Sequence, residues 1–125
     1  MLTAKSAAAV LPASDLDRAR QYYEDKLGWK PDGQDTGGLM YTVGGTSVYL
    51  YETTFAGTAQ NTALMVEVGD LESSVAELRA AGVAFADYDL PGIRTVDGIA
   101  DLDGEKAAWF TDSEGNIIAL GQRSG

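Results

Sequence analysis

Two segments of the sequence, 55 residues apart, repeat the same pattern of a short apolar run followed by an amphipathic helix. The first copy is SDLDRARQYYEDKLGW, which starts at Ser14, and the second is GDLESSVAELRAAGVA, which starts at Gly69. In both copies apolar residues recur every three or four positions, a spacing typical of a helix with one buried face. A repeat of this length that occurs only twice predicts a duplicated module and argues against a solenoid array.

Residues at the ends of the two helices support this interpretation. Ser14 followed by Asp17 predicts a capping box at the start of the first helix. Gly28 and Gly82 occupy the positions where a helix ends in a left-handed residue.

Each predicted helix is preceded by one strand-like run and followed by three, which gives the order βαβββ twice. The runs of the first half are Ala7–Ala13, Trp29–Asp32, Leu39–Val43 and Thr46–Glu52. Those of the second half are Thr62–Val68, Val83–Asp89, Glu105–Thr111 and Ile117–Gln122. We therefore predict an α+β fold: a single domain, residues 1–125, made of two βαβββ modules, residues 5–52 and 61–122. Thr53–Asn61 is the predicted link, and Pro91–Gly104 is a predicted acidic loop.

Charge and composition exclude several classes of function. The 9 basic and 19 acidic residues give a net charge of −10, which argues against nucleic acid and anionic membranes as partners. An acidic surface serves solubility, and it also raises the local concentration of cationic ligands. The sequence has no Cys and no His, which removes cysteine nucleophiles, disulfides and the commonest general base and metal ligand.

No targeting or membrane signal is evident in the sequence. The start MLTAKSAAAVLPAS faintly resembles a signal peptide, but its apolar stretch Ala7–Leu11 is too short, and Pro12 and Asp15 follow. No segment approaches the roughly 20 apolar residues of a membrane span. We therefore expect a cytoplasmic protein.

An acidic segment near the end of the predicted loop is spaced somewhat like a calcium-binding loop. Its carboxylates are Asp101, Asp103, Glu105 and Asp112. Lys106 occupies the position where such a loop needs glycine, so a solvated acidic loop is the favoured interpretation.

The closing segment AWFTDSEGNIIALGQ, Ala108–Gln122, predicts a tight hairpin with its turn at Asp112–Asn116. Together with the doubled module and the DL that opens each helix, this hairpin resembles the vicinal oxygen chelate superfamily. That group contains glyoxalases, extradiol dioxygenases and bleomycin-resistance proteins. The resemblance covers roughly residues 5–122. It implies a deeply curved, eight-stranded mixed sheet around a groove, often completed across a homodimer.

The resemblance also identifies where family enzymes hold a divalent metal with His and Glu. The matching positions in this sequence are Ala8, Tyr49, Ala63 and Ala119. None of these side chains binds a metal as His or a carboxylate does. We therefore expect no metal and no cofactor, and the glyoxalase and dioxygenase activities are in doubt.

Strand periodicity predicts which side chains line the groove. Alternate residues share a face of a strand, and two hairpins fix the pairing: Met40 is expected opposite Tyr49, and Trp109 opposite Ala119. The predicted ligand-binding residues are aromatic side chains, methionines and one carboxylate: Met40, Tyr49, Tyr51, Met65, Glu67 and Trp109. Such walls suit a flat apolar or cationic ring system. Alternatively, these side chains fill the concavity of the sheet as core.

Two functions from different classes follow. The first is a metal-free protein that binds and sequesters a small molecule, aromatic or cationic, as bleomycin-resistance members do. The second is a lyase or dioxygenase-type enzyme with no metal or with a displaced metal site built from Glu67, Glu52 or ligand oxygens. A third possibility is a dimeric scaffold protein whose groove is vestigial. Non-ligating residues at all four metal positions favour the first.

Overall fold

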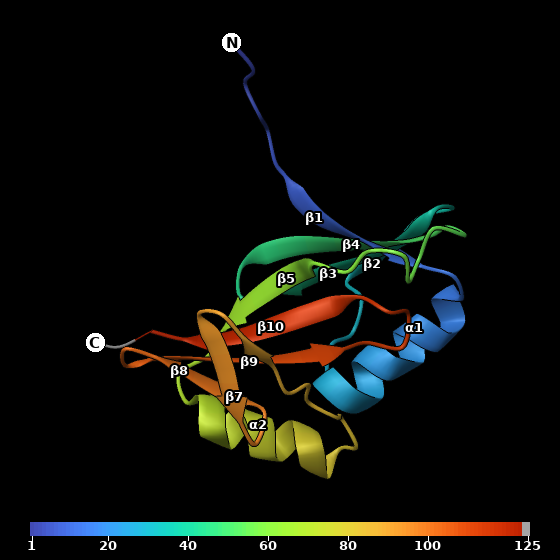
Figure 1. The fold of residues 1–125 in the computed structure, drawn as a ribbon. Helices are drawn as coiled ribbons and strands as arrows, with labels where there is room; N and C mark the ends of the chain where they lie inside the picture. The colour runs from blue at the N-terminus through green and yellow to red at the C-terminus, as the bar shows by residue number, and fades with distance from the viewer. Residues whose placement is uncertain (124–125) are drawn as a thin grey trace.

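The computed structural model describes residues 1–123, which form two β-sheets and their covering helices (Figure 1). The first sheet is four-stranded, in the order β1-β4-β3-β2, and the second is six-stranded, in the order β5-β10-β9-β8-β7-β6. The first contains β1 (Ala8–Ala13), β2 (Gly33–Gln34), β3 (Gly38–Val43) and β4 (Thr46–Glu52). The second contains β5 (Thr62–Glu67), β6 (Asp89–Leu90), β7 (Ile93–Val96), β8 (Ile99–Leu102), β9 (Glu105–Thr111) and β10 (Ile117–Gln122).

The two halves share the same pairing pattern, as expected of a duplication. In each half the strand before the helix pairs in parallel with the last strand: β1 with β4, and β5 with β10. The last strand of each half also pairs antiparallel with the strand before it, β3 or β9. The predicted α+β class is therefore confirmed.

The strand count differs from the predicted eight-stranded sheet in three places. Trp29–Asp32 is not a strand: Pro31 has no N–H to donate, and the pairing begins only at Gly33. The predicted strand Val83–Asp89 is reduced to a single bridge between Phe85 and Phe110 and to the start of β6. The predicted loop Pro91–Gly104 instead forms β7 and β8, so the sheets contain ten strands.

Turn chemistry explains the extra hairpins in the second half. Asp97 and Asp103 both adopt a positive φ, at 52° and 57°, and a glycine follows each. Asp-Gly is a strong signal for a two-residue β-turn whose twist matches that of the flanking strands. These two turns end β7 and β8 and convert the acidic segment into sheet.

The helices are α1 (Leu16–Tyr22), which continues into the π-helical turn η1 (Tyr23–Leu27), and α2 (Leu71–Ala80). Each begins at an aspartate: Asp15 accepts a hydrogen bond from the N–H of Arg18 at 3.0 Å, and Asp70 one from the N–H of Ser73 at 3.1 Å. The predicted capping box of Ser14 and Asp17 is therefore wrong. The predicted left-handed residues at the helix ends are confirmed, with φ of 72° at Gly28 and 95° at Gly82. No helix within residues 1–123 is long and apolar enough to span a membrane.

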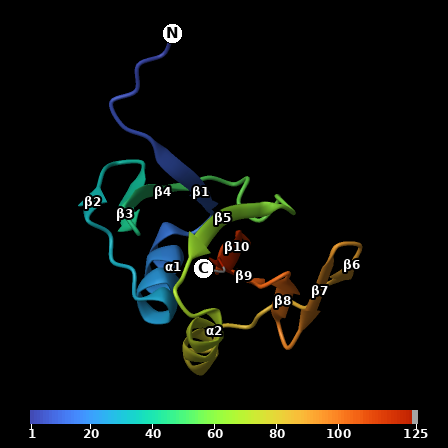
Figure 2. The same cartoon turned by 90° about the vertical axis from the view of Figure 1, so that its left-hand side faces the viewer.

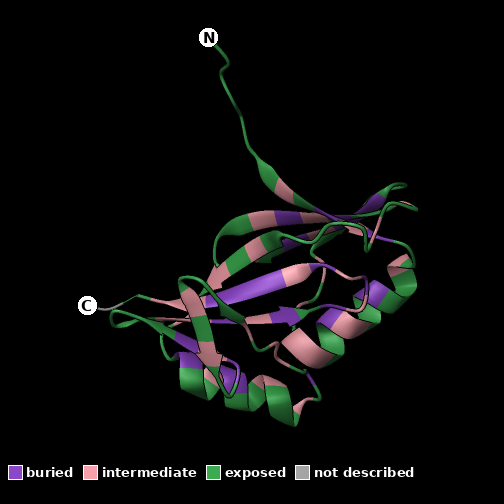
Figure 3. Cartoon of the chain, viewed as in Figure 1, coloured by how far each residue is buried: buried purple, intermediate pink, exposed green. Residues whose placement is uncertain are grey.

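Both helices cover the same side of the sheets, and the core lies between (Figure 2). One buried cluster, which includes Leu11, Tyr23 and Leu50, lies under the first sheet. A second, which includes Val75, Phe110 and Ile118, lies under the other. Leu27 and Leu64 pack against both clusters and make the core continuous. Figure 3 shows the buried residues gathered in β10 and on the sheet-facing sides of the helices.

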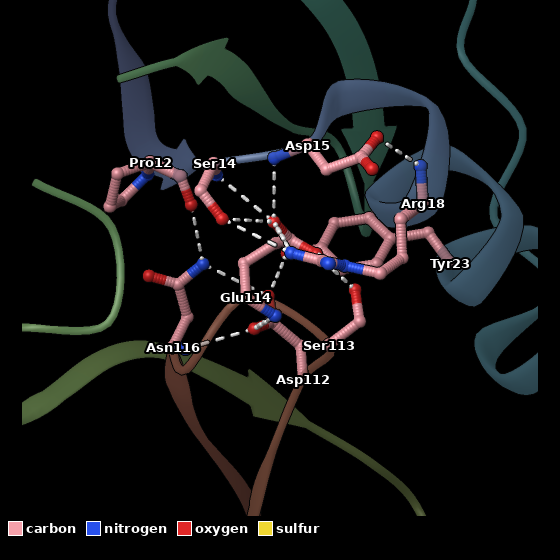
Figure 4. Close-up of polar contacts among 9 residues, drawn as sticks. All are labelled: Pro12, Ser14, Asp15, Arg18, Tyr23, Asp112, Ser113, Glu114 and Asn116. Atoms are coloured by element: carbon pink, nitrogen blue, oxygen red, sulfur yellow. Dashed lines mark hydrogen bonds and ion pairs between the residues drawn. The ribbon is translucent and has the colours of Figure 1, made fainter. Parts of the chain in front are cut away.

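The turn of the last hairpin joins the two halves (Figure 4). The side chain of Glu114 is fully enclosed, and its Oε1 accepts hydrogen bonds from the backbone N–H groups of Ser14 and Asp15, each at 3.0 Å. Its Oε2 accepts from Nε of Arg18 at 2.9 Å. Glu114 thus satisfies the N–H groups of Ser14 and Asp15, which immediately precede α1.

Two neighbours of Glu114 strengthen the same junction. Asp112 accepts a hydrogen bond from the buried hydroxyl of Tyr23 at 2.6 Å, and Asn116 donates to the carbonyl oxygen of Pro12 at 2.9 Å. The turn Asp112–Asn116 therefore binds the first half of the chain.

Candidate functional site

The faces of the sheets turned away from the helices carry the residues expected to line a groove. The predicted pairing is confirmed: Met40 lies opposite Tyr49, and Trp109 lies opposite Ala119. On the second sheet, Met65 pairs with Ala119 and Glu67 with Gly121, so β5, β10 and β9 present these side chains side by side.

A groove of about 490 Å³ runs over this part of the second sheet. Three of the predicted residues, Met65, Glu67 and Trp109, line it together. The remaining apolar lining includes Leu102, Ala107 and Ala119. Met65 is 68% exposed, so it does not belong to the core of this chain. The volume is that of a site for a small organic molecule.

A second hollow, of about 310 Å³, lies on the other side of Trp109. It is formed by Tyr88, Leu90, Ile93 and Ile117. The rings of Tyr88 and Trp109 meet edge to face, with 5.4 Å between centroids. Nothing in the sequence indicated that Ile93 contributes, because Pro91–Gly104 was predicted to be a loop, whereas Tyr88 and Ile117 lie within predicted strands. The Asp-Gly pairs at 97–98 and 103–104 were the signal that could have revealed the strands.

The other three predicted residues, Met40, Tyr49 and Tyr51, lie on the first sheet and do not line the groove around Trp109. A hollow of about 330 Å³ extends from Met65 and Glu67 toward Thr46 and Val48 of β4, but those three residues do not line it either. Within one chain the predicted set is therefore divided between two surfaces.

Tyr49 is held in place by its neighbours on the first sheet. Its hydroxyl donates a hydrogen bond to Asp35 at 2.7 Å, which raises the pKa of the phenol and lowers that of the carboxyl. The ring lies against the backbone of Gly38, where a Cβ would be 2.9 Å from Cζ of Tyr49. Gly38 is therefore required for Tyr49 to lie flat on the sheet.

The rim of the groove carries charges of both signs. Glu67 forms an ion pair with Nε of Arg123 at 3.0 Å, and the two side chains are 59% and 76% exposed. Lys106 pairs with Glu72 at 2.7 Å, and this hydrogen bond raises the pKa of the lysine. Exposed pairs of this kind are weak and open easily. A charged ligand therefore meets carboxylate and guanidinium groups that are readily displaced.

The positions at which the family resemblance implies metal ligands do not fit a metal. Ala8, Ala63 and Ala119 have no donor atom, and the hydroxyl of Tyr49 is engaged by Asp35. Glu52 and Glu67, considered above as a displaced site, end strands of different sheets. Among residues 1–123 no group of three or more acidic side chains is placed to hold an ion.

Comparison with known proteins indicates the fold that the sequence predicted. Residues 5–120 match the family model of the Glyoxalase/Bleomycin resistance protein/Dioxygenase superfamily. No protein sequence of curated function matches the chain.

Solved structures resemble it closely at low identity. UcmS2 has a TM-score of 0.75 at 18% identity, covering 96% of this chain and 98% of that one. A glyoxalase/bleomycin resistance protein/dioxygenase from Alicyclobacillus acidocaldarius has a TM-score of 0.73 at 14% identity, covering 97% and 92%. A bleomycin-binding protein complexed with bleomycin has a TM-score of 0.71 at 20% identity, covering 97% and 100%. At these identities the likeness shows the fold alone, and it confirms the predicted fold type.

Proposed function

The chain belongs to the Glyoxalase/Bleomycin resistance protein/Dioxygenase superfamily, and we propose that within it this protein binds and sequesters a small planar organic molecule without a metal. The proposed site is the groove around Trp109. The similar bleomycin-binding protein, whose structure contains bleomycin, supports ligand binding as a use of this fold.

The observation that carries the proposal is the position of Trp109 between two hollows of about 310 and 490 Å³. A flat ring system that stacks on the indole reaches apolar surface on both sides, Ile93 in one direction and Met65 in the other. The thioether of Met65 adapts its shape to different ligands. Glu67 lies at the rim, where it attracts a ligand that carries positive charge.

We also propose that the protein is a homodimer. Val10, Tyr51 and Met65 expose apolar side chains on the uncovered sheet faces. Water-exposed apolar patches of this kind mark association sites. A second copy that covers them would bring Met40, Tyr49 and Tyr51 of one chain toward the groove of the other.

Two variants test the groove, because the chain has only two tryptophans, Trp29 and Trp109. In Trp29→Phe, all tryptophan emission comes from Trp109, and titration with quinoline and N-methylquinolinium should change that emission saturably. By calorimetry, Trp109→Ala should weaken binding roughly tenfold or more, since stacking supplies on the order of 1–2 kcal/mol. Trp29→Phe is the matched control and should retain affinity.

The proposal fails if neither compound changes the emission of Trp109. It fails equally if Trp109→Ala, shown to be folded by circular dichroism, binds as tightly as the unmodified protein.

A further inference from the structure

We propose a second ligand site, separate from the groove around Trp109, in a cavity between η1 and α2 that accepts a small organic cation with an apolar body. The cavity measures about 370 Å³. It opens on the helical side of the molecule, whereas the groove lies on the opposite face of the second sheet.

Strand periodicity separates the two sites. The floor of the cavity includes Phe110 and Ile118, which face the helices. Their neighbours in sequence, Trp109 and Ala119, line the groove on the other face. Because successive side chains of a strand point to opposite faces, one small ligand cannot touch both sets.

The size and lining of the cavity suit an apolar group. A volume of about 370 Å³ falls within the usual range for small-molecule sites and far exceeds the roughly 30 Å³ of a water molecule. Leu27, Trp29 and Leu78 form its walls above the floor. An apolar body placed there replaces water against surfaces that solvate poorly.

The π-helical turn explains why Trp29 does not fill this space. After Gly28 adopts its left-handed conformation, the N–H of Trp29 donates to the carbonyl oxygen of Tyr23 at 2.9 Å. The indole then packs edge to face on the ring of Tyr23, with 5.7 Å between centroids. Trp29 is thereby held as a wall of the cavity. Short π-helical turns of this kind frequently occur at functional sites.

Charge at the mouth selects a cation. The lining contains three carboxylates, Glu24, Asp25 and Glu77, against one amine, Lys26. The amine of Lys26 is already engaged: it donates to the carbonyl oxygen of Ala81 at 2.6 Å, at the negative end of α2.

Of the carboxylates, two have partners. Lys30 lies 3.8 Å from Glu24, and Gln21 donates to Asp25 at 2.7 Å. Within residues 1–123, Glu77 has neither an ion pair nor a side-chain hydrogen bond, so it is free to pair with the cationic head of a ligand.

The test uses Trp109→Phe, in which Trp29 is the only tryptophan. The probe is benzyltrimethylammonium, and neopentylbenzene is its uncharged isostere. We expect saturable quenching of Trp29 by the cation and at least fivefold weaker binding of the neutral compound. Glu77→Gln should reduce this preference severalfold, and so should added salt. Glu52→Gln, on the distant strand β4, is the charge control.

Filling the cavity gives a second, independent readout. Ser74 lines the cavity from α2, and Ser74→Leu should abolish the response of Trp29. Ala76 lies on the exposed side of the same helix, so Ala76→Leu is the matched control and should leave the response unchanged. If Ser74→Leu does not fold, the test depends on Glu77→Gln, which changes an exposed side chain. An unchanged preference for the cation over neopentylbenzene in Glu77→Gln would then contradict the inference.

The inference is overturned if the cation leaves Trp29 emission unchanged, or if folded Ser74→Leu responds as strongly as Ala76→Leu. The same titration of Trp29→Phe reports the groove separately. A response to benzyltrimethylammonium from Trp109 alone refutes this cavity and leaves the proposed function intact. A response from Trp29 alone supports the cavity, and the titrations with quinoline and N-methylquinolinium then decide the groove separately.

Discussion

The carboxylate of Glu114 and the guanidinium of Arg18 lie 2.9 Å apart, although 96 residues separate them in the sequence. Burial alone would raise the pKa of Glu114, but hydrogen bonds from Arg18, Ser113 and the N–H of Asp15 lower it to about 2. The ionised carboxylate therefore stabilises the junction between the two halves of the chain.

Replacing Glu114 by Gln should lower the free energy of unfolding at pH 7 by about 2–3 kcal/mol, because Arg18 and the N–H groups of Ser14 and Asp15 lose their charged acceptor. A carboxyl whose pKa is depressed by folding stabilises fully above its unfolded value of 4.5, and the effect disappears as the pH falls through about 2. The difference between the variant and the unmodified protein in urea unfolding should therefore shrink between these pH values. Asp17→Asn, an exposed carboxyl in the same helix, is the control. Equal stability of Glu114→Gln at pH 7 would refute the role of this contact.

Gly38→Ala should destabilise the protein by about 2 kcal/mol or more, because a Cβ there overlaps the carbonyl oxygen of Leu50 and meets the ring of Tyr49. Gly69→Ala is the matched control, since no atom lies within 4 Å of a Cβ at that position. Thermal unfolding of the two variants measures the difference. Similar melting temperatures would contradict the close packing described for Gly38.

Glu67→Gln should weaken the binding of N-methylquinolinium more than that of quinoline, because only the former carries a charge for the carboxylate to offset. Arg123→Gln should act in the opposite direction, since it frees Glu67 from its present ion pair. Both shifts should diminish in high salt because the pair is exposed. Titration of Trp109 emission in a Trp29→Phe background measures them. If Glu67→Gln affects both compounds equally, Glu67 plays no electrostatic role.

The freshly purified protein should contain no stoichiometric divalent metal, because Ala8, Ala63 and Ala119 supply no ligand atom. Elemental analysis together with native mass spectrometry measures this directly, and a chelator should not change the melting temperature. About one tightly held nickel, zinc, iron or manganese ion per chain would contradict the proposal of metal-free binding.

The protein should sediment at about twice its chain mass of 13.2 kDa at micromolar concentration. Val10→Asp should favour the monomer, because Val10 is 56% exposed on the uncovered face of the first sheet. Ala76→Asp, on the solvent side of α2, should leave the mass unchanged. A single-chain mass for the unmodified protein would exclude the dimer.

The sequence predicted correctly the strands and turns that depend on residues close together in the chain. The bounds of β4, β9 and β10 agree with the predicted runs, and the turn at Gly44 and Gly45 fixed the pairing of Met40 with Tyr49. Both glycines have positive φ, as a two-residue hairpin requires. Alternation along these strands then predicted correctly which side chains share a face.

Local sequence patterns do not predict contacts between segments that are distant in the sequence. The turn around Glu114 was predicted, but its binding to the start of α1 depends on how the two sheets pack. The ion pair of Glu67 with Arg123 and the hollow beside Tyr88 depend in the same way on neighbours from other segments. Periodicity also gave no indication that Tyr49 and Trp109 belong to separate sheets, because it assigns a face within each strand and not the relation between sheets.

The junction at Glu114 bears on how the duplicated halves have diverged. The start of α1 is bound by a carboxylate of the second half, whereas the first N–H of α2 donates to Gln122 of its own half at 2.7 Å. The two copies are therefore no longer interchangeable, and a change at position 114 alters selection at position 18. Among related sequences these two positions should vary together, so that the acidic residue and its arginine are kept or lost as a pair.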